Sequence, residues 1–173
     1  MNTIIGIGDC RVESGPDVVL ITYALGSCVA VVVHDPVARV GGLLHFMLPD
    51  SNLDPDKAHH NPYLFADTGI PLLFHSAYEL GADRRRLNVT VAGGAQMMEA
   101  DEHFNIGKRN CAAAKKILGQ AGLMAQTEAF GGSVSRTVRL EISSGRVFLR
   151  ESGGAEHEMT WAAPLFETAN CLV

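Results

Sequence analysis

Two adjacent segments rich in Val and Leu constrain the fold of this chain more than any other feature. The first runs from Cys28 to His34 and the second from Val40 to Met47. Such dense runs of Val and Leu are typical of strands that are buried within a layered protein. Between them, the residues Asp35-Pro36-Val37-Ala38 match a type I turn with proline at its second position. We therefore expect an antiparallel hairpin in which Asp35 faces Ala38.

The remaining periodicity predicts a mixed α/β domain in which strands outnumber helices. Apolar residues recur at spacings of three and four from Asp67 to Leu80, and Gly81 follows, which indicates an amphipathic helix. A second helix is expected between a capping Asn105 and a terminating Gly122, and both helices should pack on the sheet. The polar, proline-marked stretch Pro49–Tyr63 is expected to be a long loop. Further strands are predicted at Asn2–Ile7, Val18–Thr22, Leu87–Ala92, Leu123–Phe130, Thr137–Ile142 and Arg146–Arg150, the last two as a hairpin.

The composition fits one globular domain and argues against nucleic acid and membranes as binding partners. The chain has 173 residues, of which 47% are hydrophobic, enough to bury a continuous core. Its formal net charge of −5 provides no positive field for nucleic acid or an anionic membrane surface. The longest mainly apolar run, Asp17–Val33, is interrupted by polar residues and glycine, so we expect no membrane insertion. A protein or a small molecule is the expected partner.

The four cysteines are predicted to be free thiols of a cytosolic protein. Cys10, Cys28, Cys111 and Cys171 show no C-x-x-C spacing, and the N-terminus does not resemble a secretion signal. Cys10 is expected in an early loop, Cys111 in an alanine-rich helix and Cys171 near the C-terminus, and none of these three has a paired histidine. They are interpreted as having no chemical role.

Cys28 is the exception, because the expected hairpin places it directly opposite His45. Side chains paired in this way have Cβ atoms about 4.5–5.5 Å apart, whereas a pairing shifted by one residue would send them to opposite faces. A neighbouring imidazolium lowers the pKa of a thiol, and the pair then supplies a nucleophile and an acid for amide hydrolysis. Gly26 and Ser27 permit a tight turn that could direct amide groups at an oxyanion. The plainer interpretation is that Cys28 is a small buried hydrophobe, as isolated cysteines in apolar strands most often are.

Two other patterns have plain structural interpretations. His59-His60 with nearby acidic residues resembles a metal site, but adjacent histidines point apart in extended chain, which favours a solvated loop and no metal. Gly93-Gly94 and Gly131-Gly132 do not match the spacing of phosphate-binding loops, which favours tight turns or close backbone contacts.

Longer stretches of the chain resemble one known family. The stretch LGSCVAVVVHDPVARVGGLLHFMLPDS, from Leu25 to Ser51, resembles the signature region of the CheD family. The similarity continues through AGGAQM at Ala92–Met97 and NIGKRN at Asn105–Asn110. One departure is Tyr23-Ala24, where the family commonly has a more glycine-rich approach to the LGSC turn.

The resemblance implies a protein-glutamine glutaminase, a cysteine-dependent amidohydrolase. It implies that Cys28 is the nucleophile, that His45 is its base and that Thr22, six residues before the cysteine, orients the histidine. The implied reaction converts selected chemoreceptor glutamines to glutamate with release of ammonia, through a thioester and with no metal or organic cofactor. This reaction would serve sensory adaptation in chemotaxis.

The resemblance also implies a fold, a location and partners. The family fold is a layered α/β/β sandwich shared with glutamine-deamidating toxins, expected here over residues 1–160 with a C-terminal extension at 161–173. The expected partners are the cytoplasmic helices of methyl-accepting chemotaxis receptors and the CheC phosphatase, in the cytoplasm. Two alternatives remain open: a non-catalytic or weakly catalytic module that binds CheC or the receptor, and a receptor methylesterase that uses the same Cys–His pair.

Overall fold

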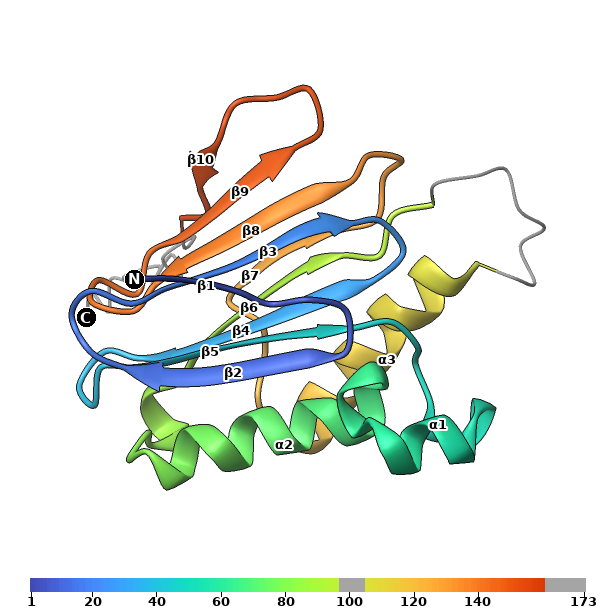
Figure 1. The fold of residues 1–173 in the computed structure, drawn as a ribbon, viewed down its shortest axis with the longest axis horizontal. Coiled ribbons are helices and arrows are strands. Elements are labelled where there is room, and N and C mark those ends of the chain that lie inside the picture. The colour runs from blue at the N-terminus through green and yellow to red at the C-terminus, as the bar shows by residue number, and fades with distance from the viewer. Residues whose placement is uncertain (97–104, 161–173) are drawn as a thin grey trace, which may run out of the picture.

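Two stacked sheets and one layer of helices form the protein (Figure 1). The computed structural model describes residues 1–96 and 105–160; the expected extension at 161–173 lies outside them. The first sheet has the strand order β1-β3-β8-β9-β10 and the second β2-β5-β4-β6-β7. The strands are β1 (Asn2–Ile4), β2 (Asp9–Ser14), β3 (Val19–Leu25), β4 (Val29–Asp35), β5 (Val40–Phe46), β6 (Asn88–Gly93), β7 (Thr127–Phe130), β8 (Arg136–Glu141), β9 (Val147–Glu151) and β10 (His157–Glu158). The helices are α1 (Pro55–His60), α2 (Ala66–Glu79) and α3 (Ile106–Gln120). The expected α/β fold with mixed sheets and two main helices is confirmed.

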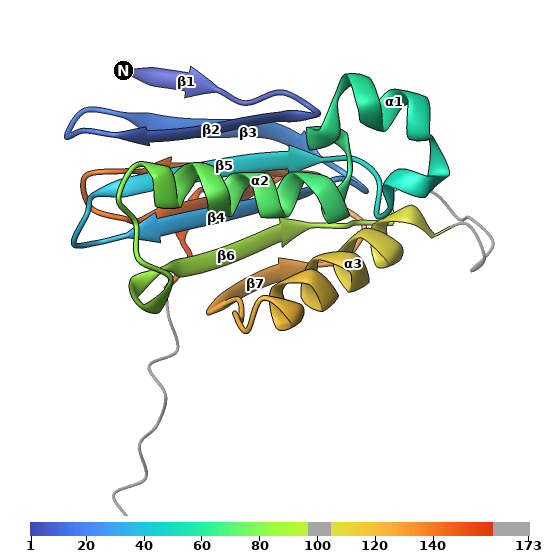
Figure 2. The same cartoon turned by 90° about the horizontal axis from the view of Figure 1, so that it is seen from below.

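The two main helices pack on the outer face of the second sheet, as Figure 2 shows. Ile70, Leu73 and Phe74 of α2 are buried there against the sheet. Asn105 caps α3 by accepting a hydrogen bond from the amide of Lys108, as its position before the helix predicts. Burial of these apolar faces against the strands stabilises helices that would be marginal in isolation.

The strand β4 lies in the middle of the second sheet and is buried along its whole length. Its side chains alternate between two apolar cores because successive residues of a strand point to opposite faces. Val29, Val31 and Val33 pack in the core under the helices, whereas Ala30 and Val32 pack in the core between the sheets. A strand between two cores explains the dense valine run.

The β4–β5 hairpin is antiparallel as predicted, but its turn is longer than predicted. Asp35 pairs with Val40 and does not face Ala38. The loop therefore holds four residues, 36 to 39, and Arg39 adopts a left-handed φ of 53°. Loops of this length are commonly built around a type I turn, so the turn itself was recognised but its extension by two residues was not.

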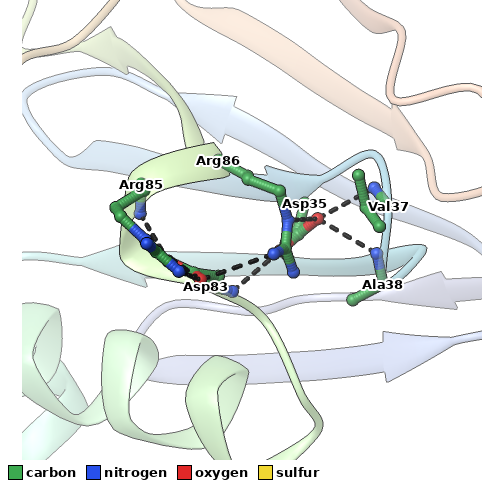
Figure 3. A network of polar contacts seen from close by, with 6 residues as sticks. All are labelled: Asp35, Val37, Ala38, Asp83, Arg85 and Arg86. Atoms are coloured by element: carbon green, nitrogen blue, oxygen red, sulfur yellow. Dashed lines mark hydrogen bonds and ion pairs between the residues drawn. The ribbon is translucent and has the colours of Figure 1, made fainter.

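The carboxylate of Asp35 fixes this turn and ties it to the segment before β6 (Figure 3). Its Oδ1 accepts hydrogen bonds from the amides of Val37 and Ala38, at 2.8 and 3.0 Å. Arg86 donates to both carboxylate oxygens, and the amide of Asp83 donates to Oδ2. Although burial opposes it, these donors hold the pKa of Asp35 well below its usual range. The side chain thus sets the register of the hairpin.

Two further sequence-based predictions are wrong in the N-terminal half. Cys10 was expected in a loop, but it lies on β2, which pairs along β5. The stretch Pro49–Tyr63 was expected to be one long loop, but it contains α1 between single 3₁₀ turns. Asp54 caps α1 and proline occupies its first turn. These local signals favour the helix although it has no periodic apolar face, which is the pattern that predicts the other helices. Within the two described ranges, no helix is long and apolar enough to span a membrane.

Candidate active site

The site is built where the two sheets face each other, from residues of both. Thr22 lies on β3 of the first sheet and His45 on β5 of the second. The Thr22 hydroxyl lies 2.8 Å from Nδ1 of His45 and 2.8 Å from the carbonyl oxygen of Ile5. A hydroxyl has one proton, and the carbonyl of Ile5 can only accept it. Thr22 therefore accepts from Nδ1–H, and the Nε2 atom of the neutral imidazole carries the lone pair.

His45 is held neutral by its surroundings. It is only 1% exposed, and its Nε2 is a buried atom without a hydrogen-bond partner among the described residues. Burial lowers its pKa to about 4, since desolvation disfavours the imidazolium. Buried polar atoms without a hydrogen-bond partner are rare in proteins. The free lone pair on Nε2 is what a group needs to accept a proton.

Cys28 lies on the same face as His45, but not directly opposite it as predicted. Because the hairpin loop is two residues longer than expected, Ala30 pairs with His45, and Cys28 immediately precedes the first pair, Val29 with Phe46. An even shift preserves the face, so Cys28 and His45 remain diagonal neighbours. Both point into the space between the sheets, where Cys28 is 9% exposed.

The thiol of Cys28 does not have the lowered pKa that the sequence suggested. Burial raises its pKa, and the hydrogen bond from its own backbone amide opposes this only in part. A lowered value requires a charged imidazolium, and burial prevents His45 from being charged near neutral pH. The free protein therefore contains a neutral thiol beside a neutral imidazole.

The segment before β4 is held firmly by β6 and the residues after it. The carbonyl of Cys28 accepts from the amide of Gly94, and the carbonyl of Gly26 accepts from the amide of Ala95, both at 2.8 Å. Gly93 adopts a φ of +117°, and a Cβ there would lie 2.2 Å from the carbonyl oxygen of Cys28. The close-contact interpretation of Gly93-Gly94 is thus confirmed. Within the described ranges, the amides of Gly26 and Ser27 donate no hydrogen bond.

Asn110 is a site residue that sequence reasoning missed. It lies on α3, is fully buried, and its Nδ2 donates to the carbonyls of Ser27 and Met47, at 2.9 Å each. It therefore joins the residue before Cys28 to the end of the strand that carries His45. The sequence placed it only within the NIGKRN stretch, and its one local signal is a polar residue on the apolar face of a helix.

Of the three other cysteines, the structure describes Cys10 and Cys111, whereas Cys171 lies outside the described residues. Cys10 packs on the helix side of the second sheet, and burial raises its pKa to about 12. Cys111 lies on α3, with its sulfur 4.0 Å from the carbonyl oxygen of Gly94. Both are free, like Cys28. In the part of the chain that the structure describes, no cluster of three His, Cys, Asp or Glu residues could hold a metal ion.

Comparison with known proteins identifies a family. Residues 47–151 match the family model described as CheD chemotactic sensory transduction. This segment begins two residues after His45, so the match does not itself involve the three site residues.

Relatives resemble the chain over most of its length. A "Probable chemoreceptor glutamine deamidase CheD" from Solibacter usitatus is 55% identical over 150 residues, covering 87% of this chain and 89% of that protein. A "Probable chemoreceptor glutamine deamidase CheD 1" from Syntrophus aciditrophicus is 48% identical, covering 91% and 99%. The "Chemoreceptor glutamine deamidase CheD" of Thermotoga maritima is 42% identical, covering 90% and 96%.

Proposed function

The chain belongs to the CheD family, and we propose on that premise that it hydrolyses glutamine side chains of chemoreceptors to glutamate, with Cys28, His45 and Thr22 as its catalytic triad. One observation carries the assignment of residues: Thr22 fixes the tautomer of His45 so that its unpartnered Nε2 is a base on the face that Cys28 occupies. The name given to the relatives supplies the substrate class.

In the first half-reaction, the sulfur of Cys28 attacks the side-chain carbonyl carbon of glutamine. Nε2 of His45 takes the thiol proton, and the carbonyl π electrons move onto oxygen to form a tetrahedral oxyanion. The imidazolium then gives the proton to the departing nitrogen, the C–N bond breaks, and ammonia leaves. The product is a thioester between Cys28 and the former glutamine.

In the second half-reaction, water replaces ammonia. Nε2 of His45 takes a proton from the water as its oxygen attacks the thioester carbon. The C–S bond then breaks, and the thiol of Cys28 regains its proton from His45. The receptor side chain is left as a carboxylic acid, which ionises to glutamate as the released ammonia takes up the proton, so no further reactant is needed.

The neutral resting pair sets the order of events in the attack. Because burial raises the pKa of Cys28 and lowers that of His45, an ion pair is unfavourable before substrate binds. The proton therefore leaves the thiol as the carbon–sulfur bond forms. The hydrogen bond that Nδ1–H of His45 donates to the Thr22 hydroxyl keeps the imidazole aligned and stabilises its charge during the step.

The backbone before β4 is our candidate for binding the oxyanion. The carbonyls of Gly26 and Cys28 accept from the amides of the two residues after β6, and the carbonyl of Ser27 accepts from Asn110 of α3. The amides of Gly26 and Ser27 are not engaged within the described residues and can serve the developing charge. Losing one such donor typically costs about 3–4 kcal/mol of transition-state stabilisation.

The test is peptide mass spectrometry of a recombinant chemoreceptor cytoplasmic fragment incubated with the protein. Specific glutamines should gain about 1 Da, with one ammonia released for each, and Cys28→Ala should abolish both. No change with the unaltered protein would refute the deamidase. If a methyl-esterified fragment instead released methanol, the methylesterase alternative would replace it.

Location and a further partner are proposed on the resemblance of Leu25–Ser51 to the family signature. We place the chain in the cytoplasm, where the thiols of Cys10, Cys28 and Cys111 stay reduced. We also propose that a CheC phosphatase competes with the receptor for the surface around Cys28. Added CheC should then lower the deamidation rate, and its removal should restore it. If CheC bound equally well to Cys28→Ala while no deamidation occurred with any variant, the chain would be a binding module.

A further inference from the structure

The exposed face of α3 is strongly basic in a chain that is acidic overall. Lys108, Arg109, Lys115 and Lys116 are all exposed on this helix. Its sequence, IGKRNCAAAKKILGQ, contains no aspartate or glutamate, although the whole chain has a net charge of −5. We call these four side chains, with Ala112 between them, the basic face.

The distribution of charge on α3 is the reverse of what helix stability favours. Acidic residues stabilise the first turn of a helix and basic residues the last, by about 0.3–1 kcal/mol each, through the helix dipole. In α3, Lys108 and Arg109 lie in the first turn, which has no acidic residue, and the last turn has no basic residue. Helix stability therefore does not explain these cations.

Three of the four cations of the basic face form no ion pair with the residues that the structure describes. Lys115 forms an ion pair with Glu128 at 2.8 Å. Over residues 1–96 and 105–160, no ion pair involves Lys108, Arg109 or Lys116. Asp50 is near enough to Lys116 and Arg109 for both to contribute slightly to its lowered pKa, although its hydrogen bonds with Asn52 dominate.

The basic face borders the candidate active site. Asn110, next to Arg109, bonds to the carbonyls of Ser27 and Met47 at the strand ends that carry Cys28 and His45. In Figure 2 the first turns of α3 lie at the same end of the sheet as the end of β5. The first turn of α3, with Lys108 and Arg109, therefore lies at the end of the sheet where Cys28 and His45 lie.

The surface beside these cations is hollowed on both sides of Ala112. One hollow of about 400 Å³ is lined by Lys108, Lys115 and Phe130. The other, of about 330 Å³, is lined by Arg109 and Lys116 and also by Asp50 and Asp67. Asp67 is engaged there by the amide and hydroxyl of Ser51. The small side chain of Ala112 lines both hollows and leaves room for a helix to approach closely.

We infer that the basic face docks a carboxylate-bearing helix of the receptor substrate. This inference rests on the proposed function, because each turnover leaves a carboxylate on the receptor beside the glutamines that remain. Basic side chains spaced along a helix complement carboxylates along a partner helix, and such complementarity raises association rates and sets orientation. The surface therefore favours receptor segments that already carry glutamates, and deamidated product competes with substrate.

The experiment measures binding separately from catalysis. In a Cys28→Ala background, affinity for a receptor cytoplasmic fragment is measured at low and high salt with Lys108→Glu, Arg109→Glu or both. Each single substitution should weaken binding by about threefold to tenfold at low salt, and the loss should shrink at high salt. The thermal midpoint should hold or rise, because glutamate suits the first turn of α3.

Arg39→Glu is the matched control, since it makes the same change of charge at the exposed β4–β5 turn, at the other end of β4 from Cys28. It should leave affinity unchanged. In the catalytic background, Lys108→Glu and Arg109→Glu should raise KM with little change in kcat. Affinity and KM that are unchanged in both variants, or an equal loss of affinity and rise in KM with Arg39→Glu, would overturn the docking surface. Charge-dependent binding without deamidation by the unaltered protein would retain the surface and reject the proposed function.

Discussion

At the scale of single residues, one hydroxyl proton determines the chemistry of the site. Thr22 donates it to Ile5 and so can only accept from His45, which leaves Nε2 as the base. Thr22→Ala should lower kcat by roughly tenfold to a hundredfold, less than His45→Ala, because orientation contributes less than proton transfer. Thr22→Ser should keep most of the activity. Equal, full activity in Thr22→Ala and His45→Ala would refute the triad.

The protonation state of Cys28 is open to direct measurement by alkylation. With Cys10, Cys111 and Cys171 replaced by alanine, the rate of iodoacetamide reaction at Cys28 should rise with pH through the alkaline range, because burial raises the thiol pKa. The rate near pH 6 should be lower than that of a free thiol. A fast rate that stays constant between pH 5 and 8 would show a preformed ion pair instead.

Asn110 is expected to affect both catalysis and stability. Asn110→Ala leaves the buried carbonyls of Ser27 and Met47 without donors, which should cost about 1–3 kcal/mol of unfolding free energy. It should also lower kcat more than it changes KM, because Cys28 and His45 lose their common support. Urea unfolding and steady-state kinetics test both effects. A variant as active and stable as the unaltered protein would remove Asn110 from the site.

The sequence predicts the proposed triad but not the groups that support it. Hairpin spacing predicts that Cys28 and His45 lie together, and the family resemblance adds Thr22. Asn110 lies far along the chain from Ser27 and Met47, and a single sequence does not show which distant backbone groups it meets.

At the scale of elements, the length of one turn decided how well the site was predicted. The antiparallel pairing of β4 and β5 was correct, but Arg39 in a left-handed conformation lengthens the loop. Cys28 and His45 still share a face because the shift is even; a shift of one residue would have separated them. The prediction that Cys28 and His45 share a face was therefore right. The predicted register was wrong, because Ala30 and not Cys28 lies opposite His45.

The end of β3 contains a strained residue next to the site. Ala24 adopts a φ of 56°, and the pairing of β3 with β8 shifts between Thr22 and Leu25. A left-handed φ destabilises the folded state by about 1–2 kcal/mol when the residue is not glycine. Glycine avoids this strain, but it loses about 0.5–1 kcal/mol more conformational entropy on folding than alanine does. Ala24→Gly should therefore raise the free energy of unfolding by up to about 1 kcal/mol. A stabilising Ala24→Gly agrees with the more glycine-rich segment that the family commonly has before the LGSC turn. A variant that unfolds more easily than the unaltered protein would show that Ala24 is not strained.

At the scale of the whole molecule, the layering creates the site. Thr22 comes from one sheet and His45 from the other, so the proposed triad forms only when the sheets are stacked. The sequence predicted the main helices and most strands because their periodicity is local. It did not predict the sheet order, because the parallel pairs β1–β3 and β6–β7 join segments whose contact no local pattern encodes.

Two buried neutral histidines should make stability depend on pH. The pKa of His45 falls to about 4 and that of His34 is also lowered, both mainly by burial. Below the unfolded value of about 6.5 the unfolded state binds more protons, so His45 alone should remove up to about 3 kcal/mol between pH 6.5 and 4. Urea unfolding at pH 7 and pH 4.5 measures the loss. His45→Gln should reduce it, and an unchanged pH dependence in that variant would contradict the buried neutral state.

The most direct test of the account is to trap the thioester on Cys28. The protein is mixed with a receptor cytoplasmic fragment, quenched in acid within a turnover and digested for mass spectrometry. We predict a covalent link between Cys28 and a receptor peptide, lighter than the sum of the two by one ammonia and absent with Cys28→Ala. Deamidated receptor that accumulates with Cys28→Ala would contradict the central claim that this thiol is the nucleophile.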